Sequence, residues 1–179
     1  CTHSIWLLRG DPRAGGSIDN VTYKTGIRDK FAWCQDPGGA IYFMGAGHLF
    51  RMIPPDGKPE NISFGSLRRR FAELNTNTHE ISLGWDWRRN GVMVFITSKA
   101  DGTSRHYFYD ATYESFWPDE LPNPFGPMVS LDFGSDNSHY RRLLLGGRDG
   151  YVRAHIDGNY QDDDWLITSE LSFAPQRVG

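Results

Sequence analysis

The chain has 179 residues and a formal net charge of −3, so it lacks the overall basic field that nucleic-acid-binding domains present. Aromatic residues make up 14% of it, and 20 glycines and 10 prolines interrupt it every few residues. This mixture favours many short strands joined by turns, and the length suits a single domain. No apolar run approaches the roughly 20 residues that a membrane-spanning helix needs.

The first expected strands form the end of a unit, 1–27, whose earlier strands are missing. Residues 4–10 are β-prone and end at a Gly-Asp-Pro turn, and residues 18–23 alternate apolar and polar side chains up to Gly26. The chain is therefore interpreted as a portion of a longer polypeptide.

The next unit, 28–78, is predicted to hold four short strands with turn residues at each joint. Those strands are expected at 31–35, 40–44, 48–53 and 60–63.

One helix is predicted, over residues 66–75, with Ser66 as its cap. One face of it is apolar, and the opposite face carries three arginines; the apolar residues are Leu67, Phe71 and Leu74, and the basic ones Arg68, Arg69 and Arg70. The arginines could contact an anion or a nucleic acid. A solvated helix face is favoured, because no aromatic residues are interleaved with them.

Two further units, 79–126 and 127–179, complete the chain. The first is expected to contain strands at 80–87, 91–97, 105–110 and 114–117, followed by an irregular proline-rich loop at 118–127. The second opens with a strand at 128–133 and ends with a long strand at 165–173. Its middle two strands meet at Asp149-Gly150, a strong signal for a β-hairpin.

The units share landmarks at a spacing of roughly 45 to 55 residues. An aspartate closes the first strand of each unit, at Asp36, Asp86 and Asp132. A glycine opens the third strand, at Gly47, Gly102 and Gly150. A second aspartate follows the third strand, at Asp56, Asp110 and Asp157. Four strands per period of this length are typical of propeller blades. The sequence thus predicts an all-β fold of β-propeller-like blades, each of four antiparallel strands, with one short helix.

Neither the cysteines nor the histidines have the spacing of a metal site or a nucleophile. Cys1 and Cys34 are expected to be small buried side chains instead of a bridge or a nucleophile. His48, His106 and His155 all fall on expected third strands, but they are out of register with one another, which argues against a shared metal. No cofactor motif is present.

Acidic residues offer two weaker alternatives. The acidic stretch 157–164 could bind calcium, although a solvated loop is favoured. A glycosidase would need an acidic pair, with candidates Glu80, Asp86, Asp110 and Tyr109. The Asp-box of sialidases is absent, although Lys99-Ala100-Asp101-Gly102-Thr103 is similar to its centre.

Most of the chain resembles β-propeller structural proteins of tailed bacteriophages. The similar segments are 4–12 with 15–19, Ile41-Tyr42-Phe43, Leu49-Phe50-Arg51 and the exit strand 167–175. Such proteins include the tail nozzle of short-tailed phages, whose propeller modules build the wall of a DNA conduit.

The resemblance implies a non-enzymatic virion component, located in the tail, without a cofactor and without a membrane span. Its partners would be copies of itself and other virion proteins. DNA would pass it transiently without sequence-specific binding. The acidic net charge of the chain would suit that passage, since lysines and arginines that neutralise phosphates would hold the DNA.

The expected contact surfaces are the arginine face and the proline-rich loop, with Pro122, Pro124, Phe125 and Pro127 as the contact residues there. Two other functions remain open. One is a secreted carbohydrate-binding or glycoside-cleaving propeller with an aromatic platform built from Trp85, Trp87, Trp117, Tyr107 and Tyr109. The other is a cellular protein-interaction propeller.

Overall fold

The computed structural model describes residues 1–55, 57–63, 65, 67–119, 121 and 126–155. For residues 161–162 and 165–166 it describes only the secondary structure. The fold is all-β, with antiparallel sheets and one short α-helix. No helix in these ranges is long and apolar enough to cross a membrane.

The strands pair in the order in which they occur along the chain. A hairpin of β1 (Ile5–Arg9) and β2 (Ser17–Thr22) comes first. A four-stranded sheet follows, made of β3 (Trp33–Gln35), β4 (Ile41–Met44), β5 (Leu49–Met52) and β6 (Glu60–Asn61). The central sheet contains β7 (His79–Asp86), β8 (Gly91–Ser98), β9 (Ser104–Asp110) and β10 (Ser115–Asp119).

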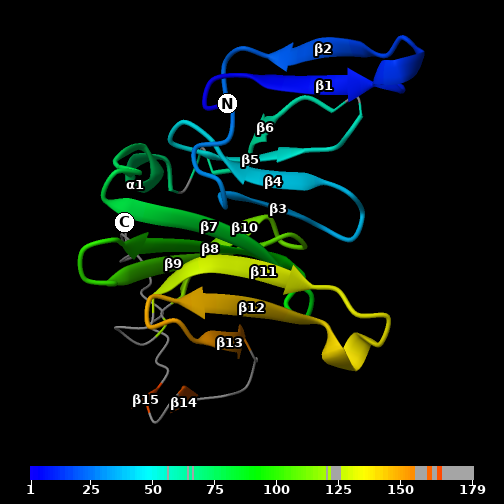
Figure 1. The fold of residues 1–179 in the computed structure, drawn as a ribbon. Coiled ribbons are helices and arrows are strands. Elements are labelled where there is room, and N and C mark those ends of the chain that lie inside the picture. The colour runs from blue at the N-terminus through cyan, green and yellow to red at the C-terminus, as the bar shows by residue number, and fades with distance from the viewer. Residues whose placement is uncertain are drawn as a thin grey trace, which may run out of the picture.

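A third sheet contains β11 (Pro127–Phe133), β12 (Arg142–Gly147) and β13 (Val152–His155), and β14 (Gln161–Asp162) pairs with β15 (Trp165–Leu166). Figure 1 shows the hairpin and the three larger sheets as successive layers. The first strands of these three sheets lie together, because β7 contacts both β3 and β11. Among the described residues the layers do not close into a ring or barrel.

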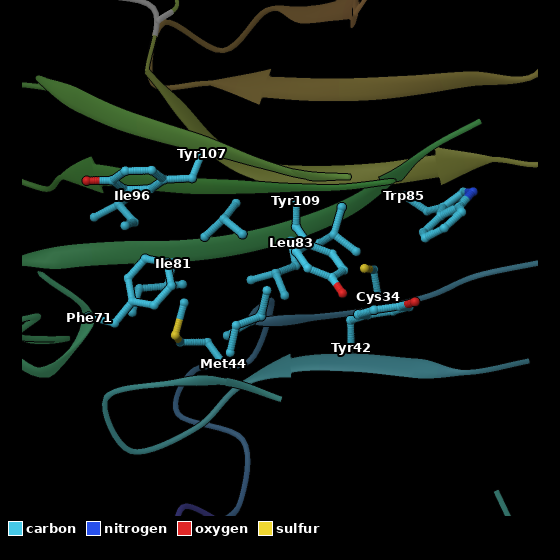
Figure 2. Packing of buried hydrophobic residues seen from close by; sticks show 14 of the residues in the cluster. Cys34, Tyr42, Met44, Phe71, Ile81, Leu83, Trp85, Ile96, Tyr107 and Tyr109 are labelled. Carbon is cyan, nitrogen blue, oxygen red and sulfur yellow. The ribbon is translucent and has the colours of Figure 1, made fainter. Parts of the chain in front are cut away.

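The central sheet is covered on both faces, and strand β8 shows how. Val92, Val94 and Ile96 point into one core cluster, which includes Tyr42 and Met44 of the neighbouring sheet. The alternate residues Met93 and Phe95 point into a second cluster with Leu143 and Leu145 of β12. Figure 2 shows the first cluster, with aromatic and aliphatic side chains filling the space between two sheets.

The outer layers keep apolar residues in solvent. On the outer face of β11–β13, Leu131 is 60% exposed and Val152 71% exposed. On the hairpin, Trp6 and Leu8 are each 51% exposed, and Ile18, which pairs with Leu8, is also exposed. The sheet β11–β13 therefore has one face packed within the chain, and both this sheet and the hairpin have an apolar face without cover in the described structure.

The glycine landmarks share one backbone conformation. Gly47, Gly102 and Gly150 have φ angles of 77°, 78° and 86°, a left-handed region that favours glycine. Each precedes the third strand of its sheet, β5, β9 or β13, at the same position in a tight turn. The repeat read from the sequence therefore corresponds to a repeated hairpin geometry.

The helix α1 spans Arg68–Ala72, shorter than the predicted 66–75. Its N-cap is Leu67, which makes no side-chain capping bond, and Ser66 lies outside the described residues. Phe71 is fully buried against the core, with Leu67 and Leu74 packed beside it, so the predicted apolar face is confirmed.

Two expectations about local structure were wrong. Pro118 is not in an irregular loop but in β10, where it pairs with Tyr107. Strand β10 is an edge strand, which tolerates a residue without an N–H group. Cys1 is exposed at the chain's start, whereas Cys34 is buried as expected, and both thiols are free.

Candidate functional site

An apolar cleft of about 730 Å³ runs across the first strands of the three larger sheets. Phe31 and Trp33 line one side, Leu83 and Gly84 of β7 form the middle, and the outer face of β11–β13 completes it. The polar residues of its lining include Asp36 and Asp132, and no lysine or arginine is among its described lining residues.

Asp132 is held by a tryptophan side chain. Its carboxylate accepts a hydrogen bond from the indole N–H of Trp87, and the guanidinium of Arg141 stacks on the Trp87 ring at 4.8 Å. Burial raises the pKa of Asp132, while the Trp87 hydrogen bond and Arg141 oppose the rise and Asp86 adds to it. This arrangement fixes the end of β11 against β7; the aspartate was foreseen as a landmark, but its indole partner was not.

Cys34 lies under the same cleft. Burial, then the nearby carboxylates of Asp132 and Asp36, raise the pKa of its thiol far above the ordinary value. A thiol held in its protonated form is a poor nucleophile. Cys34 therefore packs as a small apolar side chain.

A second cleft, of about 630 Å³, separates α1 from the central sheet. Arg69, Arg70 and Glu73 line one side of it, and Arg105 of β9 lines the other. Arg68 is not among its lining residues; it lies near His48, whose pKa is lowered by burial and then by the Arg68 charge. The three arginines of the predicted face thus separate, and Arg105, for which the sequence predicted no role, lines the same cleft as two of them.

The proline-rich contact surface is placed only in part. Pro122, Pro124 and Phe125 lie outside the described residues. Pro127 is buried at the start of β11, where its carbonyl accepts a hydrogen bond from Thr97 Oγ1 at 2.6 Å. This residue joins two sheets of the chain instead of facing solvent.

The candidate catalytic residues do not converge. Glu80 lies near the start of β7, within 3.5 Å of Lys30 and 3.3 Å of Lys99, and Asp86 lies at the other end of that strand. Asp110 accepts hydrogen bonds from Thr112 and Tyr113 in a turn. Tyr109 is 1% exposed within the core, so the four residues do not share a site.

The predicted aromatic platform was wrong for three of its five residues. Trp85, Tyr107 and Tyr109 are buried in the core cluster, and Tyr42 packs against two of them, with ring centroids 5.8 Å from Trp85 and 6.1 Å from Tyr109. Strand β9 and its neighbours face another sheet, so their alternating aromatics fill a core. Trp87 is half-buried beside Asp132, and Trp117 is exposed on the edge strand β10.

The third-strand histidines lie in different surroundings. His48 precedes β5, and His155 ends β13 with its Nε2 3.7 Å from an oxygen of Asp86. His106 is buried in β9 and neither ring nitrogen has a hydrogen-bond partner. Within the described ranges no three histidine, cysteine, aspartate or glutamate residues are grouped to hold a metal. Most of the acidic stretch 157–164 lies outside those ranges.

Comparison with family models, curated proteins and solved structures finds no match to this chain.

Proposed function

We propose that the chain forms part of a β-propeller that serves as a structural component of a bacteriophage virion, in a tail nozzle or head-to-tail assembly. The proposal rests first on the resemblance of its segments to such proteins. The sheets agree with it, because each is a meander paired in chain order and the first strands β3, β7 and β11 lie together. Blades of a propeller are arranged in this way around an axis.

The observation that carries the proposal is the pair of uncovered apolar faces. Inside the chain, the apolar face of each larger sheet is covered by another meander sheet. The outer face of β11–β13 and the hairpin face around Trp6 and Leu8 have the same character but stay in solvent. Exposed apolar faces of this kind mark interaction sites. We propose that sheets of further copies of this chain cover them.

The charge of the first-strand cleft suits a DNA conduit. Its described lining includes the carboxyl groups of Asp36 and Asp132 and no cation. Each lysine or arginine that neutralises a phosphate adds binding that must later be broken. On this proposal a further copy covers the wall of the cleft at Leu131 and Val152, and only the edge at the first strands β3, β7 and β11 faces the conduit. An edge without cations lets DNA pass without holding it.

The two alternatives are affected differently. Three of the five aromatic residues expected in a carbohydrate platform are buried in the core, so no observation favours that function. A cellular interaction propeller would use the same uncovered faces, and the two proposals differ in where the protein is found.

Immunogold electron microscopy of purified phage particles tests the proposal. An antibody against the 179-residue chain should label the tail at one end of each particle. Particles without label, together with recovery of the chain in a complex with host proteins, would contradict a virion role and favour the cellular one.

A further inference from the structure

The cleft beside α1 concentrates positive charge around an apolar floor. Three arginines line it, Arg69, Arg70 and Arg105, against one acidic residue, Glu73, and all four side chains are exposed. We infer that this cleft binds a phosphate-bearing ligand, held by Arg70 and Arg105. The inference does not depend on the proposed role in a virion.

The guanidinium groups lack strong partners within the chain. In the described part of the structure, no hydrogen bond or ion pair holds the side chain of Arg70 or Arg105. Arg69 lies 3.7 Å from Glu73, but this pair is largely exposed and contributes little. Neighbouring like charges repel one another, and a bound anion relieves that repulsion.

The number of donors favours phosphate over carboxylate. One guanidinium satisfies a carboxylate through two parallel hydrogen bonds. Three guanidiniums offer many more N–H groups than a carboxylate can accept. A phosphate group presents three oxygens and carries close to two negative charges, which suits several guanidiniums at once.

The floor of the cleft can hold the rest of such a ligand. Leu74, Ile96 and Tyr107 line it, and Tyr107 is fixed by an edge contact with the Phe71 ring, whose centroid lies 5.6 Å away. A volume of about 630 Å³ lies within the range of small-molecule sites. The cleft is therefore large enough for a phosphate ester with a flat or aliphatic body, such as a nucleotide.

The walls of the cleft are held in place by tethers from elsewhere in the chain. Arg28 donates a hydrogen bond to the carbonyl of Leu74, just after α1. Lys99 donates one to the carbonyl of Thr76 at 2.7 Å, which joins the segment after α1 to the β8–β9 turn. A preformed site loses less conformational freedom when a ligand binds.

Titration calorimetry of the 179-residue chain at low salt tests the inference. The ligands are inorganic phosphate, ADP and a short single-stranded DNA oligonucleotide, with a glutamate-rich peptide as the carboxylate comparison. The variant Arg70→Gln/Arg105→Gln removes the two free guanidiniums. Arg13→Gln is the matched control, because Arg13 is exposed on the loop between β1 and β2. Glu73→Gln removes the opposing carboxylate.

We expect Arg70→Gln/Arg105→Gln to weaken ADP binding by about tenfold or more, Glu73→Gln to strengthen it severalfold, and Arg13→Gln to leave it unchanged. Binding of phosphate and ADP identifies a free phosphate ester as the ligand; binding of the oligonucleotide with the same loss in Arg70→Gln/Arg105→Gln identifies the nucleic-acid backbone. No binding of any phosphate ligand, an equal loss in Arg13→Gln, or a peptide that binds as tightly as ADP would overturn the inference.

Discussion

The central sheet β7–β10 and the outer sheet β11–β13 differ in pattern and in surroundings: β8 is an unbroken apolar run from Val92 to Ile96, whereas β11 alternates apolar and polar residues from Val129 to Phe133. Phe95 of β8 is fully buried between two sheets, whereas Phe133 of β11 is 48% exposed. The sheets differ in neighbours, since the central sheet packs against a sheet on either face and the outer sheet packs against one. A continuous apolar run thus marks a strand with a sheet on each face, whereas Leu131 and Phe133 of the alternating β11 point to the face that no described sheet covers.

The same truncation in the two sheets tests this difference most strongly. Phe95→Ala should lower the free energy of unfolding by about 3–5 kcal/mol, because it leaves a cavity in a closed interface. Phe133→Ala should change it by about 0.5 kcal/mol or less, because water already reaches the ring. Urea unfolding followed by tryptophan fluorescence measures both. Equal losses would show that β11–β13 is as well covered as the central sheet.

Lowering the pH should destabilise the central sheet through protonation of His106. Burial, opposed by Asp119 and reinforced by His155, lowers its pKa from the ordinary 6.5 to about 4. Between these pH values the unfolded chain binds a proton that the folded chain excludes, so the stabilisation present above pH 6.5 is lost as the pH falls toward 4. The loss attributable to this residue reaches about 3 kcal/mol.

Unfolding free energies of wild type and His106→Leu across this pH range separate His106 from the carboxyl groups that titrate with it. The variant should lose less stability on acidification than the wild type. His139→Gln, a change at an exposed histidine, should retain the wild-type profile. Parallel profiles for wild type and His106→Leu would mean that His106 is not held neutral.

The close fit of the central sheet can be probed with a single methyl group. A Cβ at Gly91 would lie 2.2 Å from the carbonyl oxygen of Tyr109 and 2.5 Å from the Phe108 ring, so the strands must shift. Gly91→Ala should cost about 1–3 kcal/mol of unfolding free energy. Gly134→Ala, with open space around its new methyl group, should cost about 0.5 kcal/mol or less. A neutral Gly91→Ala in thermal unfolding would indicate looser packing.

Much of the strand order could be predicted because its signals are local. Turn glycines such as Gly47 and Gly102 require a left-handed backbone, and alternation marks the strands between them. The unbroken apolar run of β8 indicates burial on both faces, but which layer covers each face could not be read from it. Trp85 and Tyr109 were expected on a surface platform but fill a core, and Pro118 was expected in a loop but lies on an edge strand.

The candidate sites were predicted less well, because they join segments far apart in sequence. Arg69 and Arg70 could be picked out as a basic run, but only folding brings Arg105 to the same cleft. Trp87 and Asp132 are 45 positions apart and meet because β7 packs against β11. Neither pairing leaves a signal in a single sequence.

Sedimentation velocity over a concentration series tests the central claim, that the uncovered apolar faces are docking faces. The wild-type chain should associate as its concentration rises, and Leu131→Lys/Val152→Lys should stay monomeric, because each charge would have to be buried without a partner. Tyr113→Lys is the matched control, since Tyr113 is 79% exposed in the β9–β10 turn, away from both faces, and it should associate like the wild type. A wild-type chain that stays monomeric at every concentration, or a Leu131→Lys/Val152→Lys variant that associates as the wild type does, would contradict the claim.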